Sequence, residues 1–311
     1  MPLRTRRQLS RALMSTLSST YTGRFAPSPT GPLHFGSLIA AVASYLDARA
    51  NHGRWLVRME DLDPAREVSG AADIILQQLE DFGLTWDDTV MYQSRRLGAY
   101  HKALIKLRDC GLVFQCDCSR QQVRAMGKIY DGRCRQRFND IPGDHATRIR
   151  VQGRIAFEDL VQGPVIQNLE TEVGDFIIRR RDGLFAYQLA VVVDDAFQKV
   201  SHVIRGYDLL DSTPRQIYLQ RKLDFPVPAY GHVPIVTNEQ GQKLSKQHYA
   251  EPISSGDRRK LLHASLTCLG LKPPDANRKL PVSSQLDWAV TRWDIQAVPK
   301  LANIPLHELP V

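Results

Sequence analysis

Short apolar runs and amphipathic segments follow one another along this chain from residue 21 onward. The run Tyr21–Phe25 precedes the segment Ser37–Arg49, in which apolar residues recur at helical spacing. The run Arg54–Met59 then precedes two more amphipathic segments, 73–82 and 97–112. Strand, helix, strand and helix in this order predict an α/β fold with a parallel sheet and right-handed crossovers.

This pattern is interrupted after residue 115. Residues 116–173 are rich in Gly and Arg and contain only isolated strand patterns, which indicates an insertion into the α/β domain. Beyond it we predict three short strands and a helix, at 176–178, Leu189–Val193, 203–204 and 214–223. Two later segments with helical spacing, 258–269 and 284–293, predict a small helical appendage.

Charge is unevenly distributed. The chain has 311 residues and a net charge of +8, but its first 20 residues contain four arginines and no acid. Such a stretch fits a targeting peptide, a disordered basic extension, or a start codon assigned upstream of the true one, with Met14 as the candidate. We expect the disordered extension. The predicted organisation is an extension over 1–20, two halves of a Rossmann-type domain over 21–115 and 174–248, an insertion over 116–173 and an appendage over 249–311.

Composition excludes some classes of protein. Hydrophobic residues make up 43% of the chain and charged residues 24%, as in ordinary globular proteins. No apolar run approaches the roughly 18 residues that span a bilayer, so we expect no membrane span. The clustering of three of the five cysteines favours a metal site in a reducing cytoplasm, so we expect a cytoplasmic protein. Five cysteines in this length do not make a disulfide scaffold. Cys110 and Cys268 lie in apolar helical patterns and are predicted to be core residues.

A candidate nucleotide site lies between the first strand and the first helix. The loop Gly23–Gly31 (GRFAPSPTG) leads into His34, Phe35, Gly36 and Ser37. A strand that ends in such a loop before a helix presents backbone N–H groups and the positive end of the helix dipole to an anion. There His34 would bind phosphate oxygens, Gly36 would let adenine approach the backbone, and Ser37 would cap the helix.

A second candidate element for nucleotide binding is the sequence KLSK at 243–246. Lys243 and Lys246 flank Ser245 in a loop after Gly241, where two ammonium groups could close over phosphates. Neither element is specific by itself, because a histidine at a helix start is often structural and paired lysines in loops are often solvent-exposed. Their combination is far more informative.

Three motifs in order, GRFAPSPTG, RMEDLDP and KLSK, resemble the glutamyl branch of the class I aminoacyl-tRNA synthetases over residues 21–247. The resemblance implies amino-acid activation with ATP and Mg²⁺. It implies that His34 and Lys246 stabilise the pentacoordinate phosphorus, with Gly36, Ser37, Lys243 and Ser245 also at the ATP. Two positions depart from the usual family pattern: Ser37 stands where a second histidine or a related residue is usual, and Gln247 stands where a basic residue is usual.

An amino-acid site is expected near the same loop. A glutamate substrate needs a cation for its side-chain carboxylate and an acidic or dipolar partner for its ammonium group. Arg24, Glu60, Tyr187 and Arg205 lie beside predicted strands, and ligands bind at the carboxyl ends of parallel strands. The alternatives are that Arg24 pairs with Glu60, that Tyr187 is core and that Arg205 holds a turn. The resemblance implies that these four bind L-glutamate, together with Phe25, Ala26, Pro27 and Ser28, and that glutamine is rejected.

A metal site is predicted in the insertion. Cys116, Cys118 and Cys134 supply three thiolates within 19 residues, and zinc prefers four ligands in a tetrahedral arrangement. The alternative is three free cysteines in a reducing compartment. The residues alone leave four candidates for the fourth ligand: Asp117, His101, His145 and Tyr130. Short synthetases with the pattern Cys-x-Cys-x11-Tyr-x3-Cys resemble this chain, which implies Tyr130 and one structural zinc ion.

The lysine motif lies in the last quarter of the chain. Only 65 of the 311 residues come after Lys246, whereas full glutamyl-tRNA synthetases continue into a large anticodon-binding domain, so we expect no such domain. The length, the zinc pattern, Ser37 and Gln247 resemble a group of short paralogues, the glutamyl-Q tRNA(Asp) synthetases. This implies a monomer that activates glutamate without tRNA and transfers it to queuosine at the wobble position of tRNA(Asp), with the anticodon stem-loop entering the catalytic pocket.

Two other functions stay open from the sequence. One is a truncated glutamyl-tRNA synthetase that charges the 3′ end of tRNA(Glu), and the other is a non-enzymatic paralogue that binds amino acid or tRNA. The second is disfavoured because the motif residues are present. Phosphates of the stem-loop could be contacted by two basic groups, Arg179, Arg180 and Arg181 or Arg133, Arg135 and Arg137, although such runs are often simply solvated.

Overall fold

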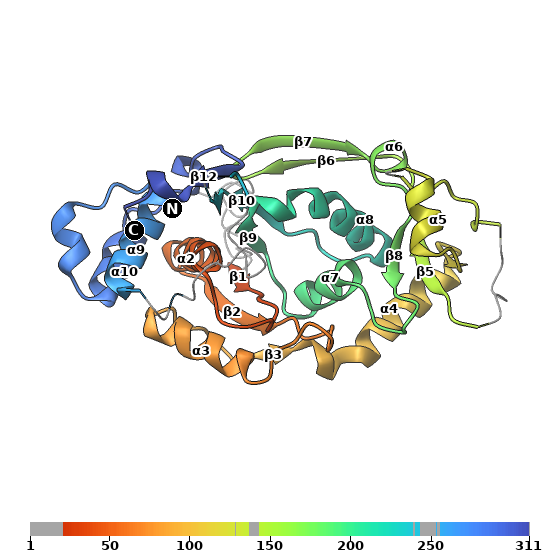
Figure 1. The fold of residues 1–311 in the computed structure, drawn as a ribbon, viewed down its shortest axis with the longest axis horizontal. Coiled ribbons are helices and arrows are strands. Elements are labelled where there is room, and N and C mark those ends of the chain that lie inside the picture. The colour runs from red at the N-terminus through yellow and green to blue at the C-terminus, as the bar shows by residue number, and fades with distance from the viewer. Residues whose placement is uncertain are drawn as a thin grey trace, which may run out of the picture.

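The computed structural model describes residues 21–127, 129–136, 143–238, 240–242, 253 and 256–310. Its long axis runs from the C-terminal helices α9 (Arg258–Cys268) and α10 (Val282–Val290) to the strands β4 (Val113–Cys116) and β5 (Ala146–Ile149) at the opposite end (Figure 1). The extension 1–20, the lysine motif and Gln247 lie outside these residues. The roles of Lys243, Ser245 and Lys246 therefore stay predictions.

Parallel strands occupy the middle of the molecule. Strand β1 (Thr22–Phe25) pairs with β2 (Arg54–Met59), which pairs with β3 (Met91–Tyr92), and β9 (His202–Gly206) pairs with β10 (Ala229–Val233). The amide of Ser201 donates to the carbonyl of Thr22 (2.9 Å), so β9 lies beside β1. The α/β fold with parallel strands is confirmed. The strand order reverses between β1 and β9, which is where ligands bind in sheets of this kind.

Helices α2 (Phe35–Ala50) and α3 (Ala71–Asp81) cover β1 and β2. The apolar side of α2 is buried in a core that also contains the fully buried Trp55 and reaches α9 and α10. The carboxylate of Asp47, on α2, accepts hydrogen bonds from the hydroxyl of Tyr21 and from Nε1 of Trp293 (2.8 Å). A residue near the end of the chain is thereby tied to the first strand and the first helix.

A second core lies among α4 (Leu97–Asp109), α7 (Tyr187–Phe197) and α8 (Thr213–Leu223). The predicted strand Leu189–Val193 is wrong, because these residues form the middle of α7. All five are buried between neighbouring elements. A helix buried on all sides has the same uninterrupted apolar run as a buried strand, so periodicity could not separate them.

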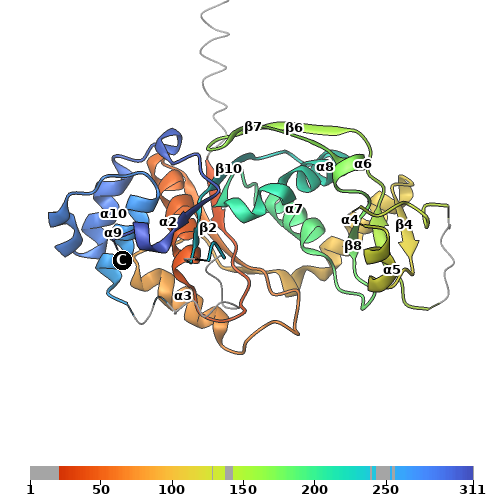
Figure 2. The same ribbon diagram turned by 45° about the horizontal axis from the view of Figure 1, so that its top comes forward.

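The segment between α4 and α7 contains antiparallel strands. Strand β5 pairs with β4 and with β8 (Phe176–Arg179), so β8 does not join the parallel strands. A hairpin of β6 (Arg154–Asp159) and β7 (Gly163–Asn168) extends over α7 and α8 (Figure 2). Next to its turn, Asp159 of β6 pairs in parallel with Tyr230 of β10. The short helices α5 (Arg120–Ala125) and α6 (Leu169–Glu172) flank these strands.

The remaining strands, β11 (Ile235–Thr237) and β12 (Asn303–Pro305), pair in parallel and bring the C-terminal segment back toward β10. Cys268 is buried in the core as predicted, but Cys110 is exposed just beyond α4, so that expectation was wrong. Among the described residues, no helix is both long enough and apolar enough to span a membrane.

Candidate active site

A cavity of about 630 Å³ opens at the carboxyl ends of β1 and β9. It brings together every described residue that the sequence assigned to nucleotide or glutamate binding: Arg24, Phe25, Ala26, Pro27, Ser28, His34, Gly36, Ser37, Glu60, Tyr187 and Arg205. Arg66 and Asp208, which sequence reasoning did not single out, also line it. Residues from six separate segments thus meet at the point where the strand order reverses.

The first helix begins at this cavity. His34 has extended backbone angles (φ −104°, ψ 170°), and its Nδ1 accepts from the amide of Ser37 (3.3 Å). The predicted cap at Ser37 is therefore wrong, because His34 caps α2. With Nδ1 accepting, the neutral imidazole carries its proton on Nε2, which lies 3.0 Å from Ser37 Oγ. That N–H therefore meets Ser37 Oγ in the first turn of α2, the end of the helix where an anion is favoured.

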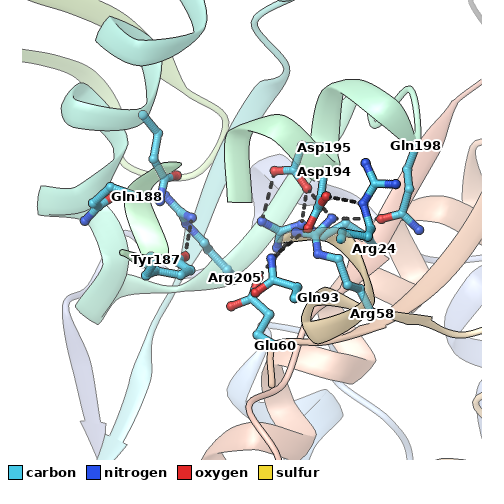
Figure 3. Close-up of polar contacts among 12 residues, drawn as sticks. Arg24, Arg58, Glu60, Gln93, Tyr187, Gln188, Asp194, Asp195, Gln198 and Arg205 are labelled. Atoms are coloured by element: carbon cyan, nitrogen blue, oxygen red, sulfur yellow. Dashed lines mark hydrogen bonds and ion pairs between the residues drawn. The ribbon is translucent and has the colours of Figure 1, made fainter. Parts of the chain in front are cut away.

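Buried ions lie beneath the cavity, where helix α7 meets β1 and β2 (Figure 3). The carboxylate of Asp195 contacts Arg24 through two atom pairs, Nε–Oδ1 and Nη2–Oδ2, both 3.3 Å long. Nη1 of Arg58 lies 2.8 Å from the same Oδ1, and its Nη2 lies 3.3 Å from Glu60. The expected alternative of an Arg24–Glu60 pair is thus not the one formed: each has a different partner.

These charges shift one another's titration. Burial alone would raise the pKa of Asp195, but Arg24 and Arg58 hold the pKa of this carboxyl below its usual value. Burial raises the pKa of Glu60 despite the attraction of Arg58 and Arg24. A ligand ammonium group beside Glu60 would favour the ionised carboxylate, so this position suits a cationic group.

The buried guanidinium of Arg205 has hydrogen-bond partners of a different kind. Its guanidinium donates to Tyr187 Oη (3.2 Å), Thr213 Oγ1 (2.8 Å) and Nε2 of His232 (3.0 Å). All three acceptors are neutral, and within the described part of the chain no carboxylate forms an ion pair with Arg205. Arg205 is only 4% exposed. A buried cation without a counter-ion favours an anionic ligand in the cavity.

The three cysteines of the insertion lie together. The Sγ atoms of Cys116, Cys118 and Cys134 lie within 4.8 Å of one another, so they could hold a metal ion. The hydroxyl of Tyr130 accepts from the amide of Cys134 (3.0 Å), and Oδ1 of Asp117 lies 3.9 Å from Cys134 Sγ. Both residues are therefore near enough to compete for the fourth position.

The two histidines proposed as alternative ligands are located elsewhere. His101 and His145 line a separate cavity of about 140 Å³, with Arg108 and Arg179. At the cysteines, burial works against ionisation of Cys116, but the hydrogen bond from Arg148 contributes to a pKa below the usual thiol value. A thiol that ionises readily suits a metal ligand.

The basic groups named from the sequence have partners within the chain. Arg180 pairs with Asp63 (3.0 Å) and Asp182 (2.6 Å), and Arg133 pairs with Asp131 (2.7 Å). Arg135 pairs with Asp175, and Arg181 donates to the carbonyl of Asp117. Arg137 lies outside the described residues. Contacts of these arginines with RNA phosphates stay a prediction.

Four buried residues of the site were missed by sequence reasoning: Arg58, Asp159, Asp195 and His232. A signal existed for Arg58, which belongs to the motif RMEDLDP, and for Asp195, since two acids at the end of a buried apolar run need buried partners. No signal existed for Asp159 and His232, because 73 residues separate them.

Comparison with known proteins agrees with this geometry. Residues 21–278 match the family described as tRNA synthetases class I (E and Q), catalytic domain. A glutamyl-Q tRNA(Asp) synthetase of Aromatoleum aromaticum is 51% identical over 286 residues, covering 90% of this chain and 91% of that one. One of Pseudomonas aeruginosa is 49% identical over 294 residues, covering 94% and 100%.

Similarity also extends to solved structures. The glutamate-tRNA synthetase of Elizabethkingia anophelis superimposes with a TM-score of 0.77 at 23% identity, over 93% of this chain and 68% of that chain. This likeness establishes the class I synthetase fold. Together with the family match and the relatives at about half identity, it confirms the resemblance inferred from the motifs: the chain belongs to the glutamyl-Q tRNA(Asp) synthetases, within the class I tRNA synthetases.

Proposed function

We propose that this protein uses ATP to activate L-glutamate, without tRNA, and transfers the glutamyl group to queuosine in tRNA(Asp). The observation that carries the proposal is the buried guanidinium of Arg205, which lacks a carboxylate partner within the described residues and faces the cavity that begins at His34. The names of the relatives at about half identity support the acceptor.

In this proposal the amino acid is held by opposite charges. Arg205 with Tyr187, and Arg24 from the same lining, bind the carboxylates of glutamate, and Glu60 binds its ammonium group. The loop residues Phe25, Ala26, Pro27 and Ser28 close the site around it. Glutamine would leave a desolvated guanidinium facing a neutral amide, which costs binding energy.

The nucleotide is placed at the start of α2. The backbone N–H groups there and Nε2 of His34 face the phosphates, Gly36 allows close approach of the adenine, and Ser37 adds a hydroxyl. Lys243, Ser245 and Lys246 would complete the site from beyond the described residues. Mg²⁺ bound with ATP supplies charge neutralisation at the phosphates.

The chemistry needs two displacements. A carboxylate oxygen of glutamate attacks the α-phosphorus, pyrophosphate leaves, and glutamyl-adenylate forms. A hydroxyl of the queuosine cyclopentenediol then attacks the activated carbonyl and loses its proton, and AMP leaves with the bonding electrons. Donors held at His34 and the helix start lower the first barrier because they are oriented before charge develops.

We further propose one structural zinc ion bound by Cys116, Cys118, Cys134 and Tyr130. The three thiols are close enough for tetrahedral coordination and the phenol adjoins them. The ion would tie β4 to the turn that carries Cys134. We also propose a monomer, and a location in the reducing cytoplasm, where thiols that are not joined in disulfides persist.

Glutamate-dependent exchange of labelled pyrophosphate into ATP, measured without tRNA, tests activation. Labelled glutamate is then offered with tRNA(Asp), queuosine-free tRNA(Asp) and tRNA(Glu). Label should survive removal of the 3′-terminal adenosine and be absent from queuosine-free tRNA. Label lost with the 3′ adenosine of tRNA(Glu) would indicate the truncated glutamyl-tRNA synthetase instead, and no exchange at all would favour a non-enzymatic paralogue.

A further inference from the structure

The support behind Arg205 comes from two buried residues outside the cavity lining. His232 lies on β10 directly opposite Arg205 of β9 in the parallel register, and Asp159 ends β6 on the other side of β10. Nδ1 of His232 lies 2.5 Å from Asp159 Oδ2, and its Nε2 accepts from Arg205 Nε (3.0 Å). The three side chains form a continuous chain of hydrogen bonds that ends at the cavity.

We propose that Asp159 and His232 are positioning residues that orient Arg205 for a glutamate carboxylate while leaving its positive charge available. The inference rests on the proposed function in one respect, that Arg205 binds glutamate. It adds that the insertion, through its β6–β7 hairpin, contributes to amino-acid recognition.

Asp159 is itself held rigidly. Its Oδ1 accepts from three backbone amides, those of Val161 (3.0 Å), Gln162 (2.9 Å) and His232 (3.1 Å). This leaves Oδ2 directed at the imidazole. A carboxylate with three amide donors cannot rotate without losing several hydrogen bonds, so it fixes the ring of His232 in one orientation.

The imidazole must be neutral and must be one tautomer. Arg205 can only donate, so Nε2 of His232 must be unprotonated and Nδ1 must carry the proton, which it donates to Asp159. Burial lowers the pKa of His232 to about 4. The charge of Arg205 also lowers this pKa, whereas Asp159 raises it. His232 is 0% exposed, so water cannot replace either bond.

A neutral ring between the two ions explains why Arg205 stays available. Arg24 touches a carboxylate directly, that of Asp195, whereas the hydrogen-bond partner of Arg205 Nε is a neutral ring. The chain of hydrogen bonds from Arg205 reaches a carboxylate only at Asp159, and the imidazole of His232 lies between the two charged groups. With Nε held by His232 and Nη2 by Thr213 (2.8 Å), the guanidinium plane is fixed and Nη1 remains near Tyr187 at the cavity.

Three variants test the proposal in the full chain. His232→Leu removes the acceptor, His232→Gln offers an amide oxygen near the position of Nε2, and Asp159→Asn can donate to Nδ1 and so select the wrong tautomer. The readout is pyrophosphate exchange, with KM for glutamate, KM for ATP and kcat measured separately. His232→Leu and Asp159→Asn should raise the glutamate KM roughly 10- to 100-fold, with the ATP KM changed less than about twofold. His232→Gln should recover part of the loss.

Tyr230→Phe is the matched control, because it alters a buried side chain of the same strand and keeps the ring above which Arg205 lies. It should leave the glutamate KM unchanged. Equal rises in both KM values, or an unchanged glutamate KM in folded variants, would overturn the proposal, as would loss of folding in all three. If the wild-type protein shows no glutamate-dependent exchange, the proposed function fails instead, so the two failures are distinguishable.

Discussion

Asp195 and Arg24 form a bidentate ion pair beneath the cavity, with Nε–Oδ1 and Nη2–Oδ2 distances of 3.3 Å. The same carboxylate lies 2.8 Å from Arg58, so one buried acid faces two buried guanidiniums. The pair therefore connects strands β1 and β2, which carry the two arginines, to helix α7. It also sets the orientation of a guanidinium that lines the proposed glutamate site.

Removing the charge of Asp195 should destabilise the fold. Asp195→Asn leaves Arg24 and Arg58 without their shared carboxylate, and breaking a buried ion pair costs about 3–5 kcal/mol. Urea denaturation should show that loss in the free energy of unfolding. Asp224→Asn is the control, because its pair with Lys106 is exposed and should contribute at most about 1 kcal/mol. Equal losses in both variants would contradict the assignment.

The same pair predicts a pH dependence of stability. Because the folded pKa of Asp195 is depressed, its contribution is fully present above the unfolded value of about 3.9 and is lost as the pH falls toward the folded value. The difference in unfolding free energy between wild type and Asp195→Asn should be constant near neutral pH and shrink below about pH 4. A difference that grows on acidification would contradict a depressed pKa at this carboxyl.

At His34 the structural and catalytic roles can be separated. His34→Asn keeps a good N-cap for α2, whereas His34→Ala removes it and should cost about 1 kcal/mol of unfolding free energy. Both variants lose the imidazole, so both should lower pyrophosphate exchange by about 10²–10³-fold. If His34→Asn exchanges like wild type, the histidine serves only as a cap.

The proposed zinc site gives a stoichiometric prediction. Freshly purified protein should contain about one zinc ion per chain, and Cys134→Ser should lose it because the buried Sγ is removed from the cluster. Cys110→Ser, at an exposed thiol, should retain the metal. Comparing metal retention against a chelator in Tyr130→Phe and Asp117→Asn identifies the fourth ligand, since only the true ligand's loss should weaken binding.

Trp293 should stabilise the whole domain through one hydrogen bond. Its Nε1 donates to the buried carboxylate of Asp47, which Tyr21 also contacts. Trp293→Phe removes this donor and should cost about 1–3 kcal/mol of unfolding free energy, because a buried acceptor loses a partner. Trp288→Phe, in the same core cluster, controls for ring size. Similar losses in the two variants would attribute the effect to packing alone.

Much of the candidate nucleotide site between β1 and α2 could be predicted from the sequence because its signals are local. The strand Arg54–Met59 has its predicted bounds, and the residues from Arg24 to Ser37 that were expected to bind glutamate or ATP line one cavity. A loop between a strand and a helix places its residues by itself. The position of His34 at the helix start follows from this. The sequence did not show that His34, rather than Ser37, caps the helix.

The supporting charges could not be predicted in the same way. The run Leu189–Val193 is uniformly apolar, and once it was assigned to a strand, Asp195 had no reason to face Arg24. Asp159 and His232 come into contact because strands β6 and β10, which are far apart in the sequence, pair in parallel. Contacts of that kind depend on tertiary packing, and no spacing in a single sequence encodes them.

The β6–β7 hairpin has a consequence for how such enzymes can be recombined. Residues 116–173 contain the hairpin, yet β6 pairs with β10 and places Asp159 against His232. Exchanging these residues as a cassette between synthetases would cut through a sheet and change the support of Arg205. A viable chimaera must therefore inherit the hairpin and strand β10 from the same parent.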